Sequence, residues 1–168
     1  MKTPASRSQK IKFCTLKFTV SAFFVTLAAH SVYAEESEPE VLIFMGLTGT
    51  CSELVIDDEP VPCSTTLFHS EHEDARIGFF YLADAPDHRI VVFSGDGNTQ
   101  KAPLTNVRLQ PIDGLVVNER MMEAEGQCIF ENPYIGPARV ECFAENESGL
   151  RFEGHFLSNG EEPRIVSQ

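Results

Sequence analysis

The chain has 168 residues, a formal net charge of −12 and 42% hydrophobic residues. This apolar fraction is too high for an intrinsically disordered protein, and the length suits one domain with a modest core. The excess of acidic residues disfavours nucleic acid and anionic membranes as partners, because like charges repel.

Residues 1–34 have the pattern of a secretory signal peptide. Five basic residues and no acid accompany an apolar run from Phe18 to Ala29, which ends at Val32-Tyr33-Ala34. The run is about a dozen residues long, whereas a membrane-spanning helix needs roughly 20. We therefore expect cleavage after Ala34, export to the periplasm or beyond, and no membrane span in the mature chain. An uncleaved N-terminal anchor is the alternative.

Cleavage would make the protein more acidic. Five of its 13 lysines and arginines lie in residues 1–34 and all 25 acids follow, so the mature formal charge would be −17 instead of −12. Such a surface favours a cationic protein as partner, although simple solubility would also explain it. We expect no cofactor, and the oligomeric state stays open.

The mature chain is predicted to be an acidic lead-in over residues 35–40 followed by one all-β domain over residues 41–168. The first strand is expected over Val41–Met45, a continuous apolar run. Gly46 to Thr50 then leads to the first of four cysteines in the mature chain.

The four cysteines indicate two disulfides in an exported protein, with three possible connectivities. We favour Cys51–Cys63 with Cys128–Cys142, because each pair brackets a plausible hairpin. A zinc site is the alternative, but it would favour close Cys-x-x-Cys pairs, which the sequence lacks.

The Cys51–Cys63 hairpin would turn at Asp57-Asp58. A two-residue turn there places Leu54 opposite Val61 and leaves Cys51 one residue out of register with Cys63. A β-bulge or a longer turn would restore the pairing.

The two cysteines of the Cys128–Cys142 hairpin are expected to be in register. Folding the stretch about Ile135 places Cys128 opposite Cys142 and Phe130 opposite Val140, and directly opposed strand residues are close enough for a disulfide. Closing this loop would stabilise the fold by about 3 kcal/mol.

Further strands are separated by turn signals at intervals of about ten residues. Such spacing predicts a single antiparallel, meander-type barrel or sandwich of about eight strands. The segment 118–125 is expected to be strand or loop rather than helix. The remaining strands are predicted over 65–68, 76–82, 89–94, 104–109, 114–117, 124–130, 138–144, 150–157 and 164–166.

The densest polar cluster runs from His69 to Asp74. Imidazole and carboxylate are suitable ligands for zinc, copper or nickel, so His69 and His72 are candidate metal ligands. In an extended segment their three-residue spacing places them on opposite faces, whereas a turn would let them converge. A solvated loop is the simpler interpretation. His88 and His155 look isolated, with His155 on a solvent-facing side of its strand.

Tyr134 and Ile135 are predicted at the tip of the Cys128–Cys142 hairpin, between two prolines. Exposed apolar residues on a loop tip are candidate binding residues. The alternative is that they fold back and cap an open barrel end. Asn146-Glu147-Ser148 matches the acceptor motif for N-linked sugar, which matters only if the source glycosylates proteins.

No catalytic motif is present, so we predict no catalytic residues and a non-enzymatic protein that binds a protein or small ligand. A metal-binding protein that uses the His69/His72 segment is the alternative, and a hydrolase is a more distant one.

The stretches GTCSELVIDDEPVPC and QCIFENPYIGPARVEC resemble uncharacterised small secreted or periplasmic all-β proteins of Gram-negative bacteria. This resemblance covers most of the mature chain and implies no activity. The general plan is also similar to that of periplasmic lysozyme inhibitors, whose active-site loop motif is not recognisable in this sequence.

Overall fold

The structure is a computed structural model that describes residues 40–85, 88–97, 100–111 and 120–167. The predicted signal peptide, its cleavage after Ala34, most of the lead-in and the strand predicted over 114–117 lie outside these residues.

Every regular element in the described residues is a β-strand. In chain order they are β1 (Val41–Ile56), β2 (Glu59–Pro60), β3 (Cys63–His72), β4 (Arg76–Ala83), β5 (Arg89–Asp96), β6 (Lys101–Pro111), β7 (Arg120–Phe130), β8 (Arg139–Asn146), β9 (Arg151–Ser158) and β10 (Arg164–Ser167).

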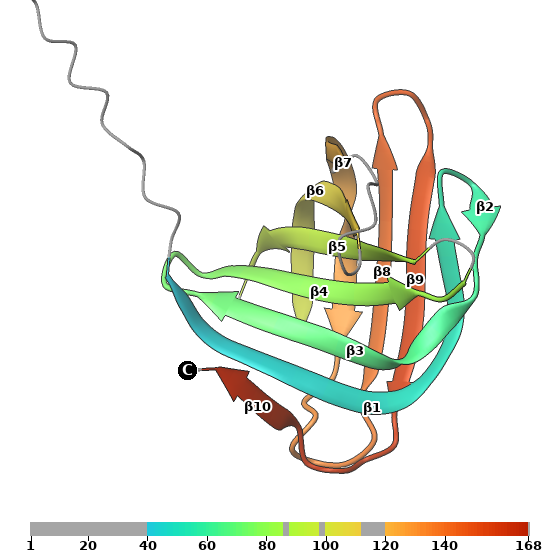
Figure 1. The fold of residues 1–168 in the computed structure, drawn as a ribbon. Coiled ribbons are helices and arrows are strands. Elements are labelled where there is room, and N and C mark those ends of the chain that lie inside the picture. The colour runs from blue at the N-terminus through green and yellow to red at the C-terminus, as the bar shows by residue number, and fades with distance from the viewer. Residues whose placement is uncertain (1–39, 86–87, 98–99, 112–119, 168) are drawn as a thin grey trace, which may run out of the picture. The chain divides into compact units, whose positions relative to one another are not determined.

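The strands form a closed antiparallel barrel. The order β1-β3-β4-β5-β6-β7-β8-β9 is a meander, and pairing of β9 with β1 closes it into eight strands, while β2 and β10 are additional partners of β1 (Figure 1). The predicted meander of about eight strands is confirmed, and the molecule is a barrel rather than a sandwich. Closure removes the unpaired edges that an open sheet would expose.

Strand β1 makes closure possible because it changes partner along its length. Thr48 pairs with Thr66 in β3, and the next residue, Gly49, pairs with Ser158 in β9. Figure 1 shows β1 curving from one neighbour to the other. A β-carbon on Gly49 would lie 2.1 Å from the carbonyl oxygen of Leu157, so only glycine allows this close approach. The sequence pattern predicted two strands in place of β1, because the glycines in its middle are typical of a connection.

Inward-facing side chains fill the barrel. Alternation along the eight barrel strands sends about every second residue inside, as expected for a small barrel. The largest fully buried aromatic side chains are Phe79, Tyr81, Phe93, Phe152 and Phe156.

Both predicted disulfides are present. Cys128 lies directly opposite Cys142 with a Cα–Cα distance of 4.1 Å, in the predicted register. The Cα atoms of Cys51 and Cys63 are 5.9 Å apart, and the ladder between β1 and β9 shifts register just after Cys51.

The turn before Cys63 is the predicted Asp57-Asp58 turn, with positive φ at both residues. Positive φ at both central residues matches the twist of a two-residue hairpin. Two disulfides indicate an oxidising, extracytoplasmic environment. The described residues contain no helix of sufficient length and apolarity to cross a membrane.

Candidate functional site

A cleft of about 280 Å³ lies at the barrel end beneath the β7–β8 hairpin. Its floor consists of inward-facing residues of β1, β3, β4, β7 and β8, and its rim includes the hairpin loop. The lining residues are Met45, Leu47, His69, Glu71, Phe79, Gln100, Phe130, Glu131, Asn132, Pro133, Tyr134 and Val140.

His69 forms part of the floor because β3 continues to His72, through a polar segment that was predicted to be a solvated loop. Its side chain faces inward, is 6% exposed, and stacks on Phe79 with ring centroids 4.6 Å apart. Nδ1 lies 3.1 Å from the carbonyl oxygen of Gly78. A carbonyl oxygen only accepts, so Nδ1 carries a proton and donates to Gly78.

Glu71 contacts the other ring nitrogen of His69, Nε2. Its Oε1 lies 3.3 Å from Nε2 of His69, and the carboxylate is about half exposed at the rim. The hydrogen bond to His69 and, to a smaller extent, the charge of the imidazolium lower the pKa of Glu71, although partial burial opposes the shift. An ionised Glu71 accepts a hydrogen bond from Nε2–H, and such a bond is strongest when the donor is an imidazolium.

The hairpin loop is held by its own turn. The Asn132 side-chain oxygen accepts a hydrogen bond from the backbone N–H of Tyr134 at 2.9 Å, and its carbonyl oxygen accepts one from Ile135 at 3.3 Å. At the loop base, Glu131 accepts a hydrogen bond from the backbone N–H of Arg139 at 2.9 Å. The loop tip is therefore presented in a defined conformation.

Both predicted tip residues are exposed, Tyr134 by 56% and Ile135 by 83%. Tyr134 lines the cleft, whereas Ile135 does not. The structure thus brings together His69, a predicted metal ligand, and Tyr134, a predicted loop-tip binding residue, in one cleft.

His72 does not join this site. It lies on the outer face of β3, where its Nε2 is 3.2 Å from the Ser70 hydroxyl. Because His69 faces inward and His72 faces outward, the two side chains lie on opposite faces of the sheet. One ion could bind both only if β3 were interrupted between them.

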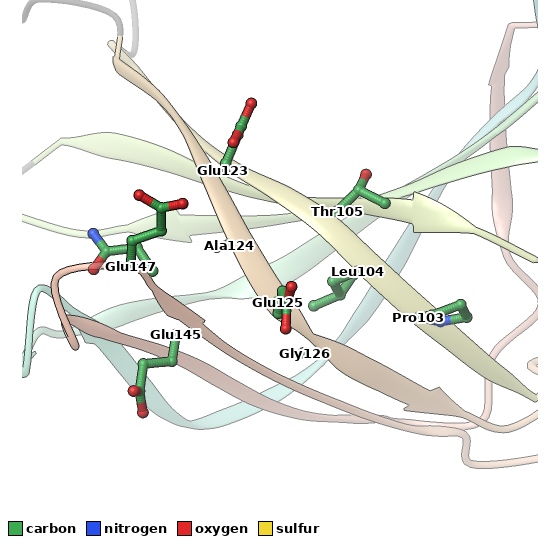
Figure 2. Close-up of a pocket in the computed structure, with 10 residues that line it drawn as sticks. Pro103, Leu104, Thr105, Glu123, Ala124, Glu125, Gly126, Glu145 and Glu147 are labelled. Atoms are coloured by element: carbon green, nitrogen blue, oxygen red, sulfur yellow. The ribbon is translucent and has the colours of Figure 1, made fainter.

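A second hollow, of about 1060 Å³, is an open acidic groove on the outer surface of β6, β7 and β8. Figure 2 shows Glu123 and Glu125 extending from β7, Glu145 from the neighbouring β8, and Glu147 from the turn that follows β8. Glu125 and Glu145 are direct cross-strand partners. The acidic groove therefore concentrates negative charge at one place on the barrel.

His155, which looked isolated in the sequence, has two acidic neighbours on the outer face. Its Nδ1 is 3.6 Å from Glu53 in β1, and its Nε2 is 3.0 Å from Glu153. Strand parity predicts that Glu153 shares its face, but Glu53 is brought there only by the β1–β9 pairing.

The comparisons with known proteins give no relative: no family model matches the chain, and no curated protein and no solved structure matches it.

Proposed function

We propose that this protein is an exported, non-enzymatic barrel that binds a basic protein by taking one of its cationic side chains into the cleft beneath the Tyr134 loop. The observation that carries this proposal is the shared cleft of His69 and Tyr134.

The chemistry of the cleft supports a cation with an apolar stem. Its floor is aromatic and aliphatic, and its rim holds two carboxylates, Glu71 and Glu131. An arginine or lysine side chain matches both properties, because its methylene stem packs on apolar surface while its head reaches a carboxylate. Tyr134 and Phe130 offer aromatic faces to the same cation.

The barrel interior supports a site at the end rather than a channel. Tyr81, Phe93 and Phe152 are all less than 2% exposed and belong to the core that fills the barrel. A ligand would therefore enter only as far as His69 and Phe79. A cleft of this size takes a side chain or a small molecule, whereas the rest of a protein partner would contact the rim.

The lining also supports binding rather than catalysis. None of its described residues is a serine, threonine or cysteine, the usual nucleophiles of hydrolases. The histidine is held by Gly78 and Glu71, and neither is a group that it could activate for attack.

The proposed location is the periplasm, reached through the signal peptide and cleavage after Ala34. The disulfides agree with an oxidising compartment. Negative charge on the mature chain would speed encounter with a basic partner, an effect that weakens as salt rises.

The proposal is tested by titrating the barrel with lysozyme, as a basic probe protein, and with an arginine-rich peptide at low salt. Isothermal titration calorimetry should detect binding that weakens in 0.5 M salt, which shortens the Debye length to roughly half its physiological value. Tyr134→Ala and Glu71→Gln should each lower the affinity about tenfold, equivalent to about 1.4 kcal/mol.

Two control variants locate the contact. Met121→Ala removes an exposed apolar side chain outside the cleft, and Glu125→Gln removes one charge from the acidic groove; both should leave the affinity unchanged. If Glu125→Gln weakened binding while Tyr134→Ala did not, the acidic groove would be the contact surface. If neither probe bound at low salt, the proposal of a cationic partner would be rejected.

A further inference from the structure

A cluster of three possible metal ligands lies on the outer face of β1 and β9, away from the cleft lining. Glu53 is the direct cross-strand partner of His155, and Glu153 precedes His155 by two residues on the same face. One donor atom from each of the three side chains lies within 4.8 Å of the other two.

We propose that Glu53, Glu153 and His155 form a binding site for a divalent transition-metal ion of the zinc class. An imidazole nitrogen with two carboxylates suits zinc and its neighbours, whereas calcium and magnesium prefer oxygen ligands alone. The site is independent of the proposed function and would stand if that function failed.

The distances suit an ion after a small rearrangement. Ligand atoms in a tetrahedral zinc site lie roughly 3.4 Å apart, since each is about 2.0–2.2 Å from the ion. His155 Nε2 and Glu153 Oε1 are 3.0 Å apart. Glu53 contacts the other ring nitrogen at 3.6 Å, and one ion bonds only one of the two nitrogens. Glu53 must therefore swing toward Nε2, which its 46% side-chain exposure allows.

The two oxygens of Glu153 already face different partners. Oε1 faces His155, and Oε2 lies 3.9 Å from Nε of Arg151. A ligating carboxylate whose second oxygen contacts a neighbouring donor is held in orientation, as in many known metal sites. Arg151 would thus position Glu153 without occupying the oxygen that the ion needs.

The surroundings leave a net negative charge for the ion. Glu141 in β8 is the cross-strand partner of His155 on its other side and contacts Arg139 at 3.7 Å. Together with Arg151, these groups add one acid and two bases to the two ligand carboxylates, so the site carries a net charge of −1 before the ion arrives. Three acids would then neutralise two arginines and half of a divalent charge.

The strands provide a fixed backbone for the ligands. Glu53 and His155 lie on two paired strands of a closed barrel, and the Cys51–Cys63 disulfide holds the chain beside Glu53. With three protein ligands and partial solvent exposure, one coordination position would stay open to water, as in zinc sites with three protein ligands.

The test is a calorimetric titration of ZnCl2 into protein purified without a histidine tag. One ion should bind per chain, and Co²⁺ should give the visible absorption of a nitrogen- and oxygen-ligated ion. His155→Ala, Glu153→Gln and Glu53→Gln should each lower the affinity roughly tenfold or more. All three side chains are partly exposed, so thermal melting should confirm that the variants fold.

His72→Ala is the matched control and should leave zinc affinity unchanged. Zinc binding that survives His155→Ala, or that disappears in His72→Ala instead, would overturn the proposal. So would a wild-type dissociation constant weaker than about 1 mM, which corresponds to only about −4.1 kcal/mol. Equal competition by calcium would also contradict the mixed nitrogen and oxygen ligand set.

Discussion

The ring of Tyr81 occupies the space that a side chain at Gly154 would need. A β-carbon at position 154 would lie 2.7 Å from Cζ of the ring. The Tyr81 hydroxyl lies 3.0 Å from the carbonyl oxygen of Val140 and 3.1 Å from that of Gly154, so it can donate to either. One aromatic side chain on β4 thereby connects this strand to β8 and β9 on the opposite wall of the barrel.

Gly154→Ala should lower the free energy of unfolding by about 1–3 kcal/mol, because it overpacks a filled core. Urea unfolding would measure the loss. The same substitution in a Tyr81→Leu background should be less destabilising, because the ring that opposes the methyl group is gone. Equal losses in both backgrounds would attribute the effect to the backbone instead.

Tyr81→Phe should lower the free energy of unfolding by about 1 kcal/mol, since it removes a buried hydrogen bond and leaves a carbonyl without its donor. Tyr134→Phe removes a hydroxyl from the exposed loop and should change stability by less than about 0.5 kcal/mol.

Alkaline pH should also destabilise the protein through Tyr81. Burial, and secondarily the charge of Glu141, raise the pKa of Tyr81 well above its ordinary value of 10.0. A tyrosine whose pKa is higher in the folded than in the unfolded state contributes to the stability of the folded protein. This contribution is fully present below the unfolded pKa of about 10.0 and is lost as pH rises above it. Tyr81→Phe should therefore show a flatter loss of stability with rising pH. Identical alkaline profiles would contradict this assignment.

Acid should weaken the floor of the cleft through Glu71. The pKa of Glu71 in the folded protein is lowered from 4.5. The contribution of Glu71 to stability is therefore fully present above about pH 4.5 and is lost as pH falls through its pKa in the folded state. Glu71→Gln should make thermal stability less dependent on pH below 4.5 than in the wild type. Glu73→Gln removes the same charge beyond the end of β3, and its profile should follow the wild type.

Relief of repulsion in the acidic groove should stabilise the barrel. Glu125 lies directly opposite Glu145, and like charges at such positions are destabilising by roughly 0.2–1 kcal/mol. Glu125→Gln should raise the melting temperature at low salt, with a smaller gain at high salt. Glu123→Gln is the control, because the cross-strand partner of Glu123 is Asn106. A gain of equal size in the control would show that net charge, rather than this pair, is responsible.

Removal of the Cys128–Cys142 disulfide should lower the free energy of unfolding by about 3 kcal/mol, measured with the double Cys→Ala variant in denaturant. Its neighbours Phe130 and Val140 are cross-strand partners and both line the cleft. The variant should therefore also weaken binding of the basic probes. The equivalent variant at Cys51 and Cys63 should lose similar stability but leave probe binding unchanged.

Local patterns predicted the features that depend on neighbouring residues. Parity about Ile135 predicted the register of the β7–β8 hairpin, because side chains alternate faces in any strand. The Asp57-Asp58 turn was also predicted correctly. The length of β1 was not, because glycines usually mark turns and the sequence contains no sign that Gly49 lies against another strand. The inward position of His69 was missed because a polar cluster usually indicates a solvated loop.

The sequence by itself determined the all-β class, the pairing of the cysteines and the exposed hairpin tip with Tyr134 and Ile135. These follow from period-2 alternation and turn chemistry, which act over a few residues. Only the tertiary structure decided that the sheet closes through β1 and β9, that His69 and Tyr134 share one cleft, and that Glu53 lies beside His155. Each of these depends on pairing between strands far apart in the chain, and such pairing is selected by packing of the whole barrel rather than by any local pattern.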